Sequence, residues 1–299
     1  MEKILVVRIA EGLGNQLFMY ANAYSLSKKF NYTLYLDDES GFYKNTRSRS
    51  YNLNIFDIPE KICPESFKFK NSFKNLKRKS QKIIDNFVLN KRFILEKISN
   101  NKLTKFEEIS EPKTLQMFIE GHYESELYFK DYESVLKKNI RIKKNLIDND
   151  NPFIDKIKKS NSVSIHLRKN RFSEVSNNFK MSNIEKDMFF EKNIINYIHR
   201  SIKYIEEKLD NPHFFIWSNR PNEFKKFFLD SKKFTFIENN NLAMDFYLFS
   251  LCKNFIVGPS TFHWWGAWLN DNQETICLRP KDINPSNNKD FWPVDWIKI

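Results

Sequence analysis

A histidine and an arginine stand at the end of a predicted strand in the second half of the chain. Residues 163–168 alternate apolar and polar side chains, which is the period of a strand whose polar side chains share one face. His166 and Arg168 stand at its carboxyl end, and Lys169 and Arg171 add positive charge beside them. Ligands of open α/β sheets bind beyond the carboxyl ends of the strands, and a guanidinium pairs with two phosphate oxygens at once. The pattern favours an anionic ligand held by Arg168 over a histidine buried only for packing.

A second stretch whose residues could bind a ligand lies within 245–270. Residues 254–257 predict a short buried strand, Gly258-Pro259 ends it, and Ser260 or Thr261 is a natural N-cap for a following helix. Backbone N–H groups, two hydroxyls and the positive end of the helix would then converge just past the carboxyl edge of a strand. That arrangement is a site for a phosphate. The stretch alone is equally compatible with an ordinary strand, turn and capped core helix.

A third candidate site lies near the N-terminus. Residues 4–9 form a β-branched apolar run, and the sequence Glu-Gly-Leu-Gly-Asn-Gln follows at 11–16. Two of the six glycines of the chain, Gly12 and Gly14, fall here, so the backbone can approach a ligand closely, and two amides stand before a helix predicted over 17–30. The spacing differs from the Gly-x-Gly-x-x-Gly of dinucleotide-binding folds. From these residues alone, a tight turn without a ligand is an equal alternative.

The elements that must position these residues alternate along the chain. Predicted strands cover 4–9, 32–36, 115–120, 163–168, 213–217, 234–237, 254–257 and 275–278. Predicted helices cover 17–30, 186–208, 221–229 and the stretches that follow 126 and 260. Such alternation builds parallel α/β sheets. A stretch rich in Lys, Asn and Asp at 142–155 separates two halves, so we predict domains at 1–150 and 151–299.

Composition excludes several classes of protein. The 299 residues include 29 Phe, so a sizeable core is available. Cys63, Cys252 and Cys277 are widely spaced in apolar surroundings, which argues against a disulfide framework or a Cys-based metal site and for a reducing compartment. No run approaches the roughly 20 apolar residues that span a bilayer, and no apolar signal segment precedes the first charged residues. The sequence predicts a cytoplasmic or peripheral protein.

The positive charge is concentrated in one segment. The net charge is +12, and residues 67–105 carry twelve Lys or Arg against Asp85 and Glu96. This segment lacks glycine and is predicted to be helical and polar. It is either a solvated face around a connecting helix or a surface for an anionic partner, such as lipid headgroups at the inner face of the plasma membrane or a phosphorylated acceptor. Nucleic acid is not expected, because aromatic residues are not interleaved with the basic ones in a known module.

Together these motifs resemble the bacterial α1,2-fucosyltransferases of glycosyltransferase family 11. The family's Gly-Leu-Gly-Asn-Gln start, His-x-Arg element, Asp-x-x-Leu-x-Ser-x-Cys-Lys block and Ser-Thr-Phe-Ser-Trp-Trp-Gly-Ala-Trp-Leu block correspond to residues 12–16, 166–168, 245–253 and 260–269. Their order and spacing match along nearly the whole chain. Family members commonly have Arg-Gly-Asp-Tyr where 169–172 reads Lys-Asn-Arg-Phe, Ser where this chain has His263, and Phe-Ser-Asp where 217–219 reads Trp-Ser-Asn. The phosphate site survives these departures, whereas recognition of the sugar and the acceptor is left open.

The resemblance implies an α/β fold of two Rossmann-like domains facing across a cleft, the GT-B type, with the nucleotide sugar held mainly by the second. It also implies an inverting transfer of L-fucose from GDP-fucose to the 2-hydroxyl of a galactose-like acceptor in lipopolysaccharide or capsule synthesis, without a cofactor or a metal. The acceptor would be a glycan or a lipid-linked oligosaccharide. Another GDP-linked deoxysugar, another acceptor hydroxyl, or a GDP-sugar-binding module without turnover are the alternatives.

By position, the resemblance implies a role for each motif residue. Arg168 would hold the donor β-phosphate with support from His166, Asp245 would lie near the guanine or its ribose, and Asn15 would reach the donor from the first domain. Other expected donor-binding residues are Gly12, Gly14, Gln16, Ser218, Ser260, Thr261 and Phe262, of which Ser260 and Thr261 would hold the pyrophosphate. The general base is not identified, and the candidates near the motifs are Glu11, Glu124, Glu126, Glu174, Asp187 and His263.

Overall fold

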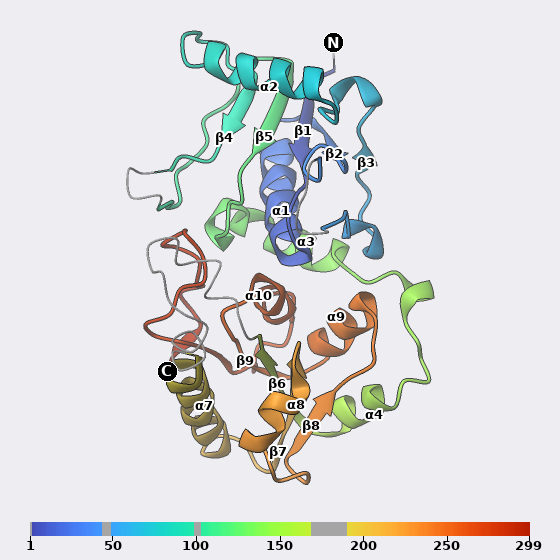
Figure 1. The fold of residues 1–299 in the computed structure, drawn as a ribbon, viewed down its shortest axis with the longest axis vertical. Helices are drawn as coiled ribbons and strands as arrows, with labels where there is room; N and C mark the ends of the chain where they lie inside the picture. The colour runs from blue at the N-terminus through green and yellow to red at the C-terminus, as the bar shows by residue number, and fades with distance from the viewer. Residues whose placement is uncertain (1, 44–48, 99–102, 169–189) are drawn as a thin grey trace. The chain divides into compact units, whose positions relative to one another are not determined.

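The computed structural model describes residues 2–43, 49–98, 103–168 and 190–299, which form two compact units (Figure 1). Unit 1 comprises Met1–Arg141 and Asn287–Phe291, and unit 2 comprises Ile142–Ser286 and Trp292–Ile299. The sequence predicted domains at 1–150 and 151–299. In the structure the chain leaves unit 1 at Arg141, and a short segment near the C-terminus returns to it.

Unit 1 is built on a five-stranded parallel sheet in the order β3-β2-β1-β5-β4. The strands are β1 (Ile4–Arg8), β2 (Thr33–Asp37), β3 (Lys61–Ile62), β4 (Phe93–Leu95) and β5 (Gln116–Glu120). The chain runs from β1 to β2 and β3 on one side and later fills β4 and β5 on the other. The carboxyl ends of β1 and β5 therefore form the topological switch point, where open α/β sheets bind their ligands.

Helix α1 (Leu13–Lys29) fills the centre of unit 1. Most of its side chains are buried all round, so it is a core helix rather than a surface one. It begins four residues before the predicted start at 17, because Gly12 is extended at the N-cap and the helical backbone starts directly after it. The described part of unit 1 also contains helices α2 (Ser72–Ile84), which precedes β4, and α3 (Glu133–Asn139), which follows β5 after two short 3₁₀ turns.

Unit 2 is built on a six-stranded parallel sheet in the order β11-β10-β9-β6-β7-β8. The strands are β6 (Asn161–Leu167), β7 (Pro212–Ser218), β8 (Phe234–Ile237), β9 (Asn254–Ile256), β10 (Cys277–Arg279) and β11 (Ile297–Lys298). The chain fills β6, β7 and β8 toward one edge, then β9, β10 and β11 toward the other. The switch point of unit 2 is therefore the pair of carboxyl ends of β6 and β9.

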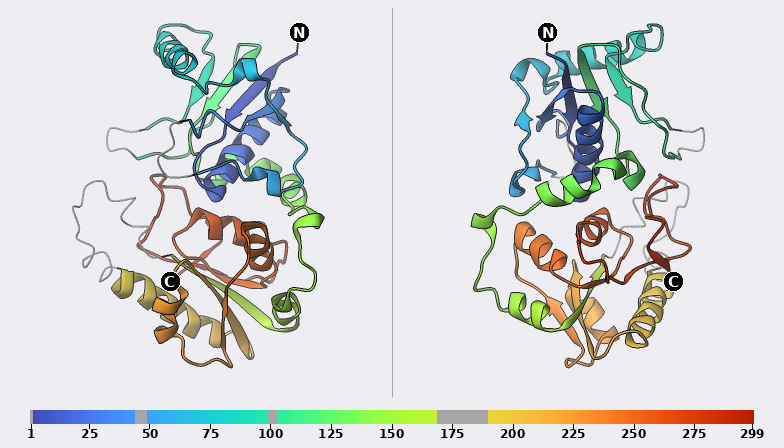
Figure 2. Two further views of the ribbon diagram at one scale, coloured as in Figure 1. Left: turned by 45° about the vertical axis from the view of Figure 1, so that its right-hand side comes forward. Right: turned by 180° about the vertical axis from the view of Figure 1, so that it is seen from behind.

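Helices cover both faces of this sheet (Figure 2). On one face α7 (Asn196–Glu206) packs on Val163, Ile165 and Leu167 of β6. The apolar cluster of the other face involves α4 (Pro152–Lys159), α9 (Leu242–Ser250) and α10 (Thr261–Trp268). The short α8 (Pro221–Phe224) follows β7. Helix α4 was not predicted, since its first half falls within the predicted separator 142–155. The predicted helix 186–208 is described only from Phe190, as a π-helical turn and then α7.

The predicted α/β class with two Rossmann-like parallel sheets is confirmed. All three cysteines are buried and free. In the part of the chain that the structure describes, no helix has the length and apolar character needed to cross a membrane. Within the same ranges, His, Cys, Asp and Glu side chains nowhere gather into a group that could hold a metal ion.

Candidate functional site

The switch point of unit 2 brings together two motifs that lie about 90 residues apart in the sequence. Gly258 follows β9 and lies against the end of β6, so closely that a Cβ atom on it would stand 2.5 Å from the carbonyl oxygen of His166. The backbone N–H of Ser260 donates to the carbonyl of Gly258 at 2.7 Å and closes a tight turn. Arg168 is the first residue after β6 and is partly exposed. The strand end that carries Arg168 and the 258–260 turn therefore form one local structure.

Helix α10 begins at this turn, as predicted. Ser260 is extended at the N-cap, with φ −149° and ψ 128°, and its side chain makes no capping hydrogen bond. Its Oγ is buried and has no hydrogen-bond partner among the described residues. Thr261, in the first turn, is also buried. A helix start without a side-chain cap leaves backbone N–H groups to bond another acceptor, and the helix dipole favours an anion there. A phosphate oxygen fits both that site and the unpartnered hydroxyl.

Aromatic rings hold His166 in place. Its ring centroid lies 6.0 Å from that of Phe262 in the first turn of α10 and 6.3 Å from that of Phe249 in α9. Phe262 in turn contacts Phe246 at 5.3 Å. The polar face predicted for β6 is therefore not open along its length, because α9 and α10 cover it. Only the carboxyl end of the strand is left for a ligand.

His263 has a structural role, which corrects its place among the candidate bases. It is fully buried. The backbone N–H of Gly258 donates to its Nδ1 at 3.1 Å, so Nε2 carries the proton and donates to Ser164 Oγ, also at 3.1 Å. Burial and the neighbouring His166 hold the pKa of His263 well below its ordinary value. The neutral ring thus ties the 258–260 turn to β6, and neither nitrogen is available to take a proton from an acceptor.

This arrangement predicts a pH dependence of stability that His263 causes. The unfolded chain binds a proton at His263 as the pH falls through about 6.5, whereas the native chain does not, because its pKa is lower. Stability is therefore lost below about pH 6.5, at up to about 1.4 kcal/mol per pH unit. We expect the free energy of unfolding of the wild type to fall more steeply between pH 7 and pH 5 than that of His263→Ser, measured by urea unfolding. Equal slopes would show that His263 takes up a proton in the native protein as readily as in the unfolded chain, and would contradict the lowered pKa.

Two further residues that were predicted to bind the sugar donor, Asp245 and Ser218, lie near the same end of the sheet. Asp245 is in the first turn of α9, and burial raises its pKa to about 6, although the side chains of Asn240 and Trp217 offset part of that effect. Ser218 ends β7, where its Oγ accepts the backbone N–H of Arg220 at 3.0 Å. Trp217 is paired in register with His166, and its ring lies 4.9 Å from Phe249 of α9. Asp245 and Ser218 therefore belong to elements that contact the His166 strand.

The N-terminal motif is the start of helix α1 rather than a loop before it. Glu11 has a left-handed backbone, with φ 63°, and a non-glycine residue in that region is often found at functional turns. Gln16 is fully buried, and its Nε2 donates to the carbonyls of Glu11 and Ser50, both at 2.8 Å. Its Oε1 accepts the N–H of Asn52 at 2.9 Å. The Gln16 amide thus clamps the turn and the 50–52 loop, whereas Asn15 is only partly buried.

Sequence reasoning missed a charged cluster at the switch point of unit 1. Arg8 ends β1 and Glu120 ends β5, next to each other in the sheet. Arg78 donates Nε and Nη2 to the two carboxylate oxygens of Glu120 at 2.6 and 2.9 Å, and Lys82 pairs with the same carboxylate. Burial alone would raise the pKa of Glu120, but these cations outweigh it and hold the pKa below its ordinary value. Glu120 ends its predicted strand, 115–120, and Arg8 is the last polar residue of the predicted strand 4–9, which is the signal that could have revealed them.

The predicted site residues fall into two sets. His166, Arg168, Ser218, Asp245, Ser260, Thr261 and Phe262 lie at one end of the unit 2 sheet, on the elements described above. Gly12, Gly14, Asn15 and Gln16 belong to unit 1. Among the candidate bases, Glu124 and Glu126 are buried, and Glu126 pairs with Lys130 at 3.1 Å. Lys169, Arg171, Glu174 and Asp187 lie outside the described residues.

The sequence is similar to one family of known proteins over nearly its whole length. The family model described as Glycosyl transferase family 11 matches residues 4–299. An alpha-1,2-colitosyltransferase of Escherichia coli is 30% identical over 310 residues, which cover 99% of each chain. The O-antigen biosynthesis glycosyltransferase WbnK, also of Escherichia coli, is 27% identical over 310 residues, which cover 97% of this chain and 99% of the relative.

A solved structure shares the fold. The fucosyltransferase NodZ from Bradyrhizobium superposes with a TM-score of 0.55 and 14% identity, covering 90% of this chain and 94% of that one. NodZ, described as an alpha-1,6-fucosyltransferase, has also been solved after soaking with GDP-fucose. At this identity the likeness shows the fold alone, and it confirms the predicted GT-B type.

Proposed function

The chain belongs to glycosyltransferase family 11, and from that premise we propose that it transfers L-fucose, or a closely related deoxysugar, from a GDP-linked donor to the 2-hydroxyl of a galactose-like unit. The acceptor we propose is a growing surface glycan, free or lipid-linked. The names of two relatives support this: one is an alpha-1,2-colitosyltransferase and the other acts in O-antigen biosynthesis. The GDP-fucose bound by a protein of the same fold supports the nucleotide.

One observation carries the proposal for the donor. The Arg168 strand end and the uncapped start of α10 lie together at the β6 and β9 switch point. A pyrophosphate offers oxygens enough for a bidentate guanidinium, for backbone N–H groups at a helix start and for a hydroxyl. Arg168 is assigned to the β-phosphate, and Ser260 and Thr261 to the pyrophosphate. Asp245 is assigned to the guanine or its ribose, where a carboxylate can accept two N–H or O–H groups.

The proposed reaction is a single displacement with inversion. The acceptor oxygen forms a bond to the anomeric carbon while the bond from that carbon to the β-phosphate oxygen breaks, and the electron pair leaves with GDP. Negative charge therefore grows on the phosphate as the reaction proceeds, and preorganised donors at that position stabilise the transition state. Arg168 and the start of α10 supply such donors. The hydroxyl proton passes to a base that no described contact identifies, or late to water or phosphate.

The donor sugar is the finer point of the proposal. L-fucose follows from the family resemblance, whereas colitose follows from the name of the 30% identical relative. A purified enzyme supplied with GDP-fucose and GDP-colitose in separate reactions, with a galactose-terminated oligosaccharide as acceptor, tests both. Mass spectrometry and NMR of the product identify the sugar and the linkage. Binding of a GDP-sugar without any transfer or hydrolysis would favour a binding module instead.

The absence of a metal requirement is a separate expectation. The sequence has no Asp-x-Asp pair beside its motifs, and a guanidinium with a helix start can stabilise the leaving phosphate electrostatically in place of a divalent ion. We expect the initial rate of transfer to be unchanged in excess EDTA, measured with the same acceptor. A loss of rate that manganese or magnesium restores would contradict this expectation.

A further inference from the structure

Helix α2 exposes its apolar side chains to solvent. Phe73 and Leu76 are three residues apart, and Ile83 and Ile84 follow Leu76 about two helical turns later, which places all four on one face of the helix. They are 78%, 63%, 62% and 50% exposed, respectively. A surface helix normally turns its apolar stripe toward the core, but α2 has no buried residue at all. Figures 1 and 2 show it as an outlying helix of unit 1.

The opposite, polar face of α2 fixes this orientation. Arg78 makes its two-pronged contact with Glu120 of β5, and Lys82 pairs with the same carboxylate and lies 5.5 Å from the ring centroid of Phe93. Asp85, directly after the helix, accepts the backbone N–H of Phe93 at 2.7 Å. Ion pairs and hydrogen bonds therefore hold the polar side against the sheet, and the apolar side must face outward.

The exposed apolar surface continues past the end of the helix. Phe87, Val88 and Leu89 lie two to four residues after Asp85, and all three are exposed. Phe87 also falls on the helical spacing of Leu76 and Ile83. Contiguous apolar surface of this kind marks an interaction site on a soluble protein. The sequence predicted the segment 67–105 to be helical, polar and basic, whereas the α-helix covers only Ser72–Ile84, Phe93–Leu95 forms β4, and the exposed apolar surface was not predicted.

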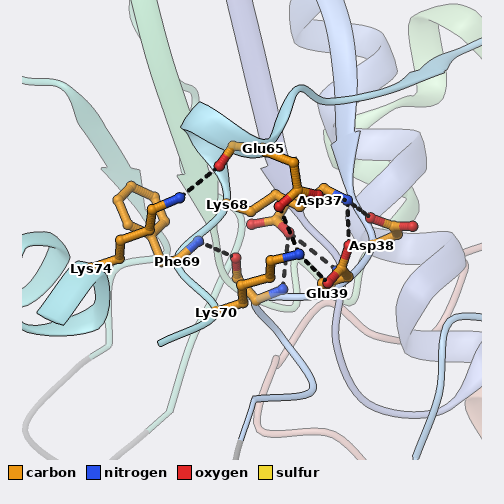
Figure 3. Close-up of polar contacts among 9 residues, drawn as sticks. Asp37, Asp38, Glu39, Glu65, Lys68, Phe69, Lys70 and Lys74 are labelled. Atoms are coloured by element: carbon orange, nitrogen blue, oxygen red, sulfur yellow. Dashed lines mark hydrogen bonds and ion pairs between the residues drawn. The ribbon is translucent and has the colours of Figure 1, made fainter. Parts of the chain in front are cut away.

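The charges beside this surface are positive. Lys77 and Lys79 are exposed on either side of the apolar stripe. Other cations of the basic segment are neutralised by acidic residues from outside α2: Figure 3 shows Lys68 and Lys70 among acidic side chains, and the ion pairs join Lys68 to Asp38, Glu39 and Glu65, and Lys70 to Glu39 and Glu65. Lys68 and Lys70 are thus paired with carboxylates, whereas Lys77 and Lys79 place positive charge beside the apolar stripe.

We propose that the apolar face of α2, with residues 87–89, docks on an anionic lipid surface. An interfacial helix sinks its apolar side chains into the boundary between headgroups and acyl chains, while lysines at the flanks meet the lipid phosphates. A second copy of this chain is a poorer partner, because it would bring the same positive charge to the contact. Lipid binding requires no sugar donor, so the proposal does not depend on the identity of the substrate.

The test is co-sedimentation of the full chain with vesicles. We expect binding to vesicles that contain phosphatidylglycerol and much weaker binding to phosphatidylcholine vesicles. Phe73→Ser combined with Leu76→Ser should lower the partition coefficient at least about tenfold, since each buried side chain contributes strongly to partition. Lys77→Gln and Lys79→Gln should each lower it about fivefold at low salt and have little effect at high salt.

A matched control tests whether vesicle binding depends on this face or on any exposed apolar side chain. Leu229 in unit 2 is 82% exposed and lies outside the segment, so Leu229→Ser should leave vesicle binding unchanged. Transfer to a soluble acceptor should also be unchanged in the Phe73→Ser/Leu76→Ser protein, which shows that it is folded. Equal binding to neutral and anionic vesicles, equal losses for Leu229→Ser, or a self-association that only the Phe73→Ser/Leu76→Ser variant abolishes would overturn the proposal.

Discussion

Replacement of Arg168 by alanine should lower kcat/KM about 10³-fold or more, which is the largest effect that we expect from one side chain. Arg168 follows the last residue of β6, beside the turn that starts α10. Charge on the leaving GDP grows as the glycosidic bond breaks, so the guanidinium contact strengthens in the transition state and the loss should appear in kcat as well as in KM. Initial rates with GDP-fucose as the varied substrate measure both constants.

Three companion variants make this prediction specific. Arg168→Lys keeps the charge but loses the two-pronged contact, so we expect it to restore only part of the activity. Lys169→Ala and Arg171→Ala should cost much less, because of these three cations only Arg168 is assigned to the β-phosphate. A folded Arg168→Ala protein with near-native transfer, alongside an inactive Arg171→Ala protein, would move the phosphate contact to Arg171.

Replacement of Gly258 by alanine should have the second largest effect, about 10²-fold in kcat/KM. The added Cβ would meet the carbonyl oxygen of His166 at 2.5 Å, and this neighbour is backbone, which cannot move as a flexible side chain could. The turn must therefore shift away from the end of β6. It would carry Ser260 with it, and a misplacement of about 1 Å at a reacting group can cost about 10²-fold.

The same substitution should disturb the turn more than the fold. The Gly258 N–H bond to His263 anchors the turn to β6, so we expect some loss of melting temperature as well as the loss of rate. The informative measurement is calorimetric binding of GDP to the folded variant. A native affinity for GDP with native kcat would mean that the turn does not hold the pyrophosphate.

Most elements of the fold were predictable because their signals are local. Strand β8, at Phe234–Ile237, was predicted to the residue, and the other predicted strands differ from the observed ones by one or two residues at one or both ends. An apolar run bounded by polar turns is sufficient to identify a short buried strand. The start of α10 was predicted from the break at Gly258-Pro259. The very short β3 and β11, of two residues each, carry no such signal and form only because neighbouring strands offer an edge.

The parts of the site that escaped prediction depend on contacts distant in sequence. Nothing local distinguishes His263 as a buried brace from His263 as a base, because the answer depends on Ser164, 99 residues away. Gln16 looked like a ligand-binding amide until its three hydrogen bonds placed it in the support of a loop. The outward apolar face of α2 was missed because Arg78 and Lys82, which set its orientation, find their partner Glu120 in another strand.

The most direct test of the central claim is a calorimetric titration of the wild type and Arg168→Ala with GDP-, UDP- and dTDP-linked sugars. A site built for GDP at the β6 and β9 switch point predicts saturable binding of GDP-fucose or another GDP-linked deoxysugar by the wild type, and no saturation with the UDP- or dTDP-sugars. It also predicts a marked loss of that affinity in Arg168→Ala. Tighter binding of a UDP- or dTDP-sugar, or an unchanged affinity for GDP-fucose in Arg168→Ala, would contradict the account.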